Sequence, residues 1–168
     1  MLKKGTLIIL FMVLLLTACG PVVPQAMRKE VDGSLSFEEL FRDPEAHKGK
    51  VVLLGGEIIE TKNLREETQI EVLQRPLAYD DSPRITDESK GRFLILHSGF
   101  LDGAVYQKGR RITVVATVRG RKVLPLGERE YAYPLVVDQF LHLWPRRSGY
   151  EPGWTIGVGI GGTIEIGK

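Results

Sequence analysis

The sequence predicts a mainly β domain in which five antiparallel strands close into a small barrel. Three observations support this fold class. Five segments rich in β-branched and aliphatic residues follow one another along the chain, and two of them place apolar residues at alternate positions. A glycine pair, Gly55-Gly56, interrupts the first segment. Such a pair is typical of a bulge or sharp bend, which lets a sheet curl on itself.

A short helix is expected before the first strand. Ser36 is followed three residues later by Glu39, which resembles a capping box. Phe37 and Phe41 share one face of the helix that would start there. Pro44 is expected to end it.

The predicted strands cover residues 51–61, 68–73, 91–97, 111–119 and 133–143. In the second strand, Ile70 and Val72 lie on one face. The inner face of the fourth strand is expected to consist of four residues: Ile112, Val114, Ala116 and Val118. A polar loop over residues 78–90 precedes the third strand, and residues 98–108 leave room for a helical turn before the fourth.

This order of elements is that of an OB-like five-stranded Greek-key barrel with one or two short helices. Closing the sheet removes open edges and gives a small domain a core without disulfides. An open antiparallel sheet with a helix on one face is the alternative. The barrel domain is predicted over residues 35–152, followed by a Gly-rich β tail over residues 153–168.

The first residues have the pattern of a secretory signal peptide. Lys3 and Lys4 precede ten unbroken apolar residues, 7–16, and the segment closes on Ala18 and Cys19. A permanent membrane span needs about 20 apolar residues, so this run is too short for one. We expect a signal peptide over residues 1–18 that is cleaved between Ala18 and Cys19.

The residues around the cleavage site predict a lipid anchor. Leu16-Thr17-Ala18-Cys19 resembles the lipobox of bacterial lipoprotein precursors. The thiol of Cys19 would carry a diacylglyceryl group through a thioether, and its freed amine would be acylated. Cys19 is the only cysteine of the chain, so no intramolecular disulfide can form. The alternative is an ordinary signal peptide followed by a chance cysteine, and no cofactor is expected besides the covalent lipid.

Residues 19–34 are predicted to form a lipidated tether, because they contain Pro21 and Pro24 and lack an apolar period. A flexible stretch of that length would hold the domain roughly 20 Å from the bilayer. The whole chain has 23 Lys plus Arg against 21 Asp plus Glu, and losing Lys3 and Lys4 leaves 21 against 21. This balance gives no general attraction to nucleic acid.

Basic residues near the fourth strand suggest an anion-binding surface, which an OB-like barrel can present. These residues are Arg110, Arg111, Arg119, Arg121 and Lys122. In a cell envelope, lipid phosphates or lipopolysaccharide are better candidate anions than nucleic acid. An ordinary solvated strand face is the alternative, and residues 146–147 could join the surface.

No catalytic or metal site is expected. His47, His97 and His142 are far apart in sequence and belong to no spaced metal motif. His97 precedes Ser98 and Asp102 is nearby, yet no nucleophile-elbow motif surrounds this serine.

Paired acids occur at Glu66-Glu67 and Asp80-Asp81, where hairpins or loops are predicted. A general acid needs burial beside a partner, so we interpret both pairs as solvated loop charge.

The last residues alternate strictly between apolar side chains and small or polar ones. The apolar residues at even positions are Trp154, Ile156, Val158, Ile160, Ile164 and Ile166. A hairpin through Gly161-Gly162-Thr163 keeps them on one face, which would pack on the barrel, a second copy or the membrane surface. A tail frayed in isolation is the alternative.

Short motifs spread over the mature chain carry a family resemblance. They include Gly55-Gly56-Glu57-Ile58, Thr68-Gln69-Ile70-Glu71-Val72, Arg75-Pro76-Leu77, Gly99-Phe100-Leu101-Asp102 and Tyr131-Ala132-Tyr133-Pro134. In their order and spacing the chain resembles the Slp family of outer-membrane lipoproteins, of which starvation-inducible proteins are members. The resemblance implies attachment to the periplasmic face of the outer membrane, and no settled enzymatic role. Gly20, directly after Cys19, agrees with outer-membrane sorting.

We therefore expect a non-enzymatic envelope lipoprotein with a structural or binding role, held on the membrane by its lipid. The family resemblance implies that this role is related to stress. One alternative is an accessory module for envelope assembly or transport that binds a protein partner or anionic lipid. An envelope enzyme is the other. Self-association or capture of an envelope protein is expected to involve the tail.

Overall fold

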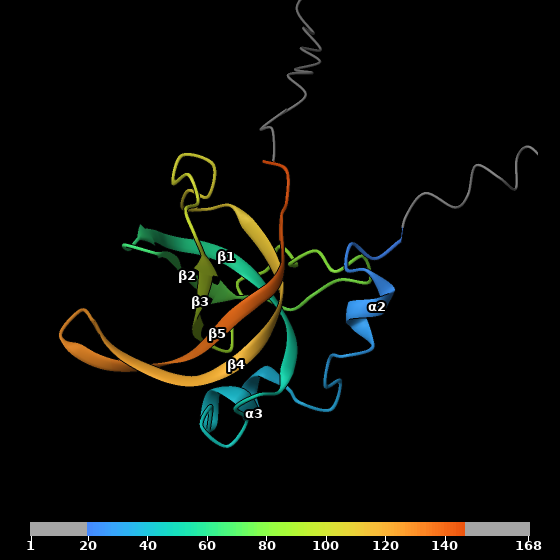
Figure 1. Ribbon diagram of the computed structural model, residues 1–168, viewed down its shortest axis with the longest axis horizontal. Coiled ribbons are helices and arrows are strands. Elements are labelled where there is room, and N and C mark those ends of the chain that lie inside the picture. The colour runs from blue at the N-terminus through green and yellow to red at the C-terminus, as the bar shows by residue number, and fades with distance from the viewer. Residues whose placement is uncertain (1–19, 147–168) are drawn as a thin grey trace, which may run out of the picture.

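Five strands and two short helices make up residues 20–146, the part of the chain that the computed structural model describes (Figure 1). The strands are β1 (Val51–Asn63), β2 (Glu67–Gln74), β3 (Arg92–Ser98), β4 (Arg111–Leu126) and β5 (Arg129–Leu143). The helices are α2 (Gln25–Arg28) and α3 (Phe37–Arg42). The prediction of a mainly β domain with one or two short helices is confirmed for this part.

The five strands form one sheet that closes into a ring in the order β1-β2-β3-β5-β4, with β4 paired to β1. The alternative of an open sheet is therefore wrong. The prediction that all strands are antiparallel is also wrong, because β3 and β5 run parallel through the pairs Leu94↔Leu135 to Leu96↔Val137. An odd number of strands cannot alternate in direction all around a closed ring, so one parallel pair is required.

Strand β1 bends at the point where its pairing partner changes from β4 to β2. Gly56 pairs with both Gln74 of β2 and Ile112 of β4. A Cβ atom at Gly56 would lie 2.1 Å from the carbonyl oxygen of Leu73, and one at Gly55 would lie 2.4 Å from a methyl group of Leu77. The glycine pair therefore permits close backbone packing at this bend, whereas the register shift of β1 lies farther along, between Ile58 and Glu60.

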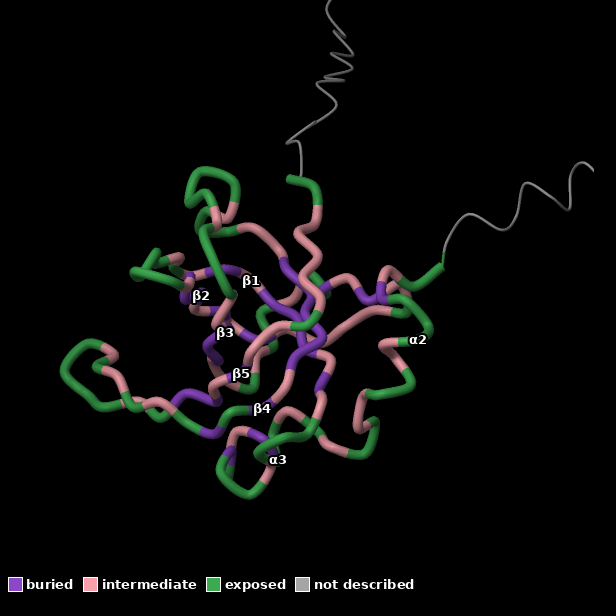
Figure 2. Tube along the Cα trace, viewed as in Figure 1, coloured by how far each residue is buried: buried purple, intermediate pink, exposed green. Residues whose placement is uncertain are grey.

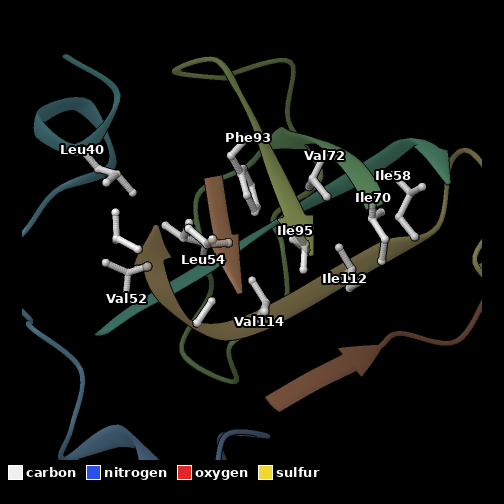
Figure 3. Packing of buried hydrophobic residues seen from close by; sticks show 13 residues of the cluster. Leu40, Val52, Leu54, Ile58, Ile70, Val72, Phe93, Ile95, Ile112 and Val114 are labelled. Atoms are coloured by element: carbon white, nitrogen blue, oxygen red, sulfur yellow. The ribbon is translucent and has the colours of Figure 1, made fainter. Parts of the chain in front are cut away.

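Apolar side chains from all five strands point into the ring and form the core (Figure 3). The predicted inner face of β4 is confirmed, since its four residues are buried and belong to the core. Ile70 and Val72 of β2 are also completely buried. Helix α3 closes one end of the core with Leu40, and its capping box between Ser36 and Glu39 is present as predicted. Figure 2 shows that burial is concentrated in the ring and falls away toward the loops.

Strands β4 and β5 continue well past the ring as a two-stranded hairpin, which the sequence did not predict (Figure 1). Pairing runs from Gly120↔Leu135 to Leu126↔Arg129. Gly127 has φ 63°, which suits the first central residue of a two-residue hairpin turn. The prolines and charged residues of this stretch are typical of a loop. Backbone pairing between β4 and β5 nevertheless holds the stretch in an extended conformation.

Residues 20–34 do not form a free tether, so this part of the prediction is wrong. They contain α2, and Val23 is buried. The backbone N–H of Val22 donates to the carbonyl of Asp80 at 3.2 Å, and that of Asp32 to the carbonyl of Val51 at 2.8 Å. The segment has no apolar period because it packs through backbone groups and single side chains rather than through one helical face.

Residues 98–108 contain a turn in place of a helix. The N–H groups of Val105 and Tyr106 both donate to the carbonyl of Asp102, at 2.9 Å each. This one turn is not continued, and it leads through Gly109 into β4.

Replacing Val114 by Asp should unfold much of the ring. Val114 is fully buried, so the new carboxylate would lie in the core without a partner, at a cost of several kcal/mol in a domain stabilised by about 5–15 kcal/mol. Urea unfolding of the purified chain would measure the loss.

The matched control is Val123→Asp. Val123 lies on the same strand but is 48% exposed on the hairpin, so this carboxylate stays in water. We expect a change within about 0.5 kcal/mol, as is usual for surface substitutions. Equal unfolding midpoints for the two variants would contradict the described register of β4.

Candidate functional site

A pocket of about 560 Å³ opens on one side of the ring, where the loop after β2, the turn before β4 and the segment after β5 meet. Its lining residues are Glu57, Arg75, Arg84, Ile85, Thr86, Asp87, Gln107, Lys108, Gly109, Arg110, Arg111, Pro145 and Arg146. Volumes of this order are typical of small-ligand sites.

The pocket carries an excess of positive charge. Six of its residues are Lys or Arg and two are acidic, so its formal charge is six minus two, or +4. Arg75 lies 3.8 Å from the carboxylate of Glu57. The other five cations form no ion pair within residues 20–146. Most of the charge is therefore not neutralised by neighbouring carboxylates of the described chain.

Backbone carbonyls hold the two half-buried arginines that precede and begin β4. Arg110 donates from Nη1 to the carbonyl of Val105 at 3.1 Å and from Nη2 to that of Trp144 at 2.7 Å. Its Nε is buried and has no hydrogen-bond partner in the described chain. Arg111 donates to the carbonyl of Pro83 at 3.0 Å, and its guanidinium carbon lies 5.9 Å from the ring centre of Trp144. Neutral carbonyls orient these groups but leave their charge intact.

The remaining cations of the pocket differ in exposure. Arg75 is largely covered, with 13% of its side chain exposed, and donates to the carbonyl of Glu88 at 3.2 Å. Arg84, Lys108 and Arg146 are exposed. Arg146 also donates to the carbonyl of Ala104 at 3.2 Å. The pocket thus combines oriented, half-buried guanidinium groups with solvated charges.

The structure divides the predicted anion-binding residues between two places. Arg110 and Arg111 line the pocket. Arg119 and Arg121 are exposed in the middle of β4, eight and ten residues after Arg111, or roughly 26 and 33 Å along the strand from the pocket. Lys122 donates to the side-chain oxygen of Gln69 at 2.6 Å. The five residues therefore do not form one surface, because a long strand separates the pairs.

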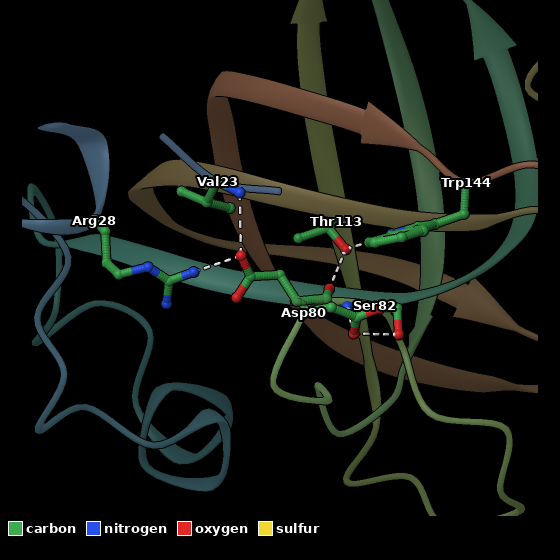
Figure 4. A network of polar contacts seen from close by, with 7 residues as sticks. Val23, Arg28, Asp80, Ser82, Thr113 and Trp144 are labelled. Carbon is green, nitrogen blue, oxygen red and sulfur yellow. Dashed lines mark hydrogen bonds and ion pairs between the residues drawn. The ribbon is translucent and has the colours of Figure 1, made fainter. Parts of the chain in front are cut away.

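Beside the pocket, a network centred on Asp81 attaches the N-terminal segment to the ring (Figure 4). The carboxylate of Asp81 accepts the N–H of Val23 at 3.1 Å and also a hydrogen bond from Arg28. Its carbonyl accepts the hydroxyl of Thr113 at 2.7 Å, and this hydroxyl accepts the indole N–H of Trp144 at 2.8 Å. Asp81 is thus buried, and its interpretation as solvated loop charge is wrong.

The neighbouring Asp80 stays near the surface and shapes the loop. The hydroxyl of Ser82, and then its backbone N–H, hold the pKa of Asp80 below its ordinary value of 3.8. The stability that these bonds give is present above that value and is lost as the pH falls through the lower pKa of the folded state.

The histidines do not come together. His97 bonds through Nδ1 to Asp138 at 2.8 Å, whereas Asp102 accepts the N–H of Ala104. The ring of His142 lies edge-on to that of Trp144. Within residues 20–146, no three His, Cys, Asp or Glu side chains are grouped as metal ligands.

Several predicted features lie outside the described residues. They are the signal peptide with Ala18, the lipid site Cys19, Arg147, and the tail hairpin over residues 153–168. They stay predictions. In the part that is described, no helix is both long and apolar enough to cross a membrane.

Sequence comparison connects this geometry to a family. The sequence model of a family described as "Outer membrane lipoprotein Slp family" matches residues 16–157 of the chain. The matched residues include the predicted lipid site, the ring and the pocket. The chain belongs to this family. It is accordingly an outer-membrane lipoprotein of the Slp family, as the resemblance predicted.

Three similar proteins are each less than a third identical to the chain. The outer membrane protein Slp of Escherichia coli is 29% identical over 91% of this chain and 89% of its own length. An uncharacterized protein of Haemophilus influenzae is also 29% identical, over 88% of this chain and 81% of its own length. The uncharacterized lipoprotein YeaY of E. coli is 26% identical over 71% of this chain and 62% of its own length. No solved structure matches the chain.

Removing the Asp81 carboxylate should detach the N-terminal segment of this Slp family protein. Asp81→Ala leaves the N–H of Val23 and the guanidinium of Arg28 without their acceptor, at a cost of about 2 kcal/mol for bonds to a charged group. Hydrogen exchange at residues 22–28 should accelerate, while exchange in β1 to β5 changes little.

Asp80→Ala is the matched control, because the side chain of Asp80 bonds only within its own loop, to Ser82. Its backbone carbonyl still accepts the N–H of Val22. Protection of residues 22–28 should persist in this variant. Equal exchange in both variants would show that Asp81 does not hold the segment.

Proposed function

We propose that this Slp family protein is anchored by lipid on Cys19, faces the periplasm, and has a non-enzymatic structural or binding role there. The lipobox-like residues before Cys19 and the match to an outer-membrane lipoprotein family support the anchor. The pocket supports binding rather than catalysis, because its polar groups are mainly cations held by backbone carbonyls. A role in stress, as the family resemblance implied, belongs to the same proposal.

The observation that carries this proposal is the attachment of the N-terminal segment to the ring. Val22 bonds to Asp80 and Val23 is buried, only three and four residues after Cys19. Three extended residues span roughly 10 Å, so the lipid would begin close to the loop that holds Asp80. The ring would then rest near the bilayer, instead of floating on a long tether.

This attachment would also place one side of the ring next to the membrane and the opposite side away from it. Helix α2 and the loop after β2 lie on one side of the ring, and the tip of the β4–β5 hairpin lies on the opposite side (Figure 1). Tyr79, beside Asp80, is 84% exposed, and Ile85 is 65% exposed. We assign these side chains to the face that meets the membrane and the hairpin to the face that points into the periplasm.

A second candidate function is that of an accessory module for envelope assembly or transport. The pocket favours the version of this function in which the ligand is an anion, such as an anionic lipid. The exposed hairpin offers a separate surface for a protein partner.

We infer further that the ring is an OB-like barrel. The strand order β1-β2-β3-β5-β4 and the single parallel pair support this topology. The connection from β3 to β4 has only one turn in place of a helix. An experimental structure of the chain tests the inference directly.

Lipid attachment is tested by Cys19→Ala. Without the thiol no thioether can form, so incorporation of labelled palmitate should be abolished and uncleaved precursor should accumulate. Labelling followed by electrophoresis measures both effects.

Arg119→Gln serves as the control for expression and export, because Arg119 is exposed on β4 and is not part of the predicted cleavage and lipidation motif. It should be labelled like the unchanged chain. Undiminished palmitate on the Cys19→Ala chain would overturn the assignment of the lipid site.

A further inference from the structure

Most of the positive charge of the pocket has no counter-charge within the described chain. Its formal charge is +4, and within residues 20–146 only Arg75 of its six cations is ion-paired. Bringing like charges together at a concave surface concentrates the positive potential there. A bound anion would relieve this repulsion.

The pocket is also organised in a way that favours one anion class. The guanidinium groups of Arg110 and Arg111 are oriented by carbonyls before any ligand arrives, so little side-chain entropy is lost on binding. Guanidinium groups fit the oxygens of carboxylates and phosphates. The buried Nε of Arg110 still lacks an acceptor in the described chain.

The charge and the volume of the pocket favour phosphates over carboxylates. A carboxylate carries one negative charge, whereas a phosphate monoester carries about 1.5–2 at neutral pH and has three acceptor oxygens. Two such phosphates would match a formal charge of +4, and a pocket of about 560 Å³ is too large for one. We infer that the pocket binds a ligand that carries two phosphate groups.

The position of the pocket leaves two sources for these phosphates. Arg111 donates to the carbonyl of Pro83, in the same loop that holds Val23 through Asp81, so the pocket lies beside the N-terminal segment. Lipid headgroups could reach it if the anchor lies where we propose. A soluble diphosphate of the periplasm could reach it as well. This inference deepens the second candidate function and rests on it, but not on lipid attachment.

The test measures binding of inorganic pyrophosphate to the full chain in neutral detergent by titration calorimetry. The pocket variant is Arg110→Gln with Arg111→Gln, which shortens the two oriented cations and removes their charge. Binding should weaken at least about tenfold, as expected for losing charge-assisted hydrogen bonds. A second pocket variant, Lys108→Gln with Arg146→Gln, changes only exposed residues, so its folding is not at risk. It should also weaken binding.

The control, Arg119→Gln with Arg121→Gln, removes the same charge from the middle of β4, outside the pocket. It should change the affinity by about twofold or less, as expected for distant solvated charges. Absence of pyrophosphate binding to the unchanged chain, or equal weakening in control and pocket variants, would overturn the inference. Equally tight binding of malonate, a dicarboxylate, would overturn the choice of phosphate.

Vesicles identify the source. The lipidated chain is reconstituted in phosphatidylcholine vesicles with and without diacylglycerol pyrophosphate, a lipid whose headgroup carries two phosphates, and pyrophosphate affinity is measured again. Weaker apparent affinity with this lipid supports the site and assigns it to lipid headgroups, through competition. Unchanged affinity supports the site and assigns it to a soluble phosphate. Failure of the Cys19→Ala labelling test would leave the detergent titration unaffected, so the two proposals fail separately.

Discussion

The pairing of β4 with both β1 and β5 is the constraint on which the rest of the structure depends. It closes the ring and buries the inner face of β4 in the core. It also fixes what packs on the outer face of β4. There the hydroxyl of Thr113 donates to the carbonyl of Asp81 and accepts the indole N–H of Trp144. The pocket lies where β4 begins, between the Asp81 loop and the segment after β5. Core, N-terminal attachment and pocket are thus parts of one arrangement.

Asp81 attaches the N-terminal segment to this arrangement. Its φ of 69° is unusual for a residue with a side chain, and the backbone turn brings its carboxylate to Val23 and Arg28. A buried carboxylate is stable only when it is paired and hydrogen-bonded, and Asp81 has both kinds of partner. If Cys19 carries the lipid as we propose, this contact limits how far the ring can move from its anchor.

Features encoded by nearby residues could be predicted from the sequence. The capping box needs only Ser36 and Glu39, and the inner face of β4 follows from alternation within one strand. Features that depend on ring closure could not. Asp81 is buried and ion-paired with Arg28, which lies 53 residues away in the sequence. The parallel pair of strands follows from the odd number of strands in the ring.

The candidate site shows the same limit. Arg110 and Arg111 were predicted from a local run of basic residues, but that run extended to Arg121, which lies elsewhere. Arg146 was expected to join this surface and lines the pocket, whereas Arg75 and Arg84 join it only through the fold. The central claim, that the N-terminal segment holds one side of the ring at the membrane, is tested by spin labels at Tyr79→Cys and Glu128→Cys on the lipidated chain in vesicles with nickel-chelating lipid. The account predicts strong relaxation enhancement at position 79 and little at position 128. Equal enhancement at both positions would contradict it.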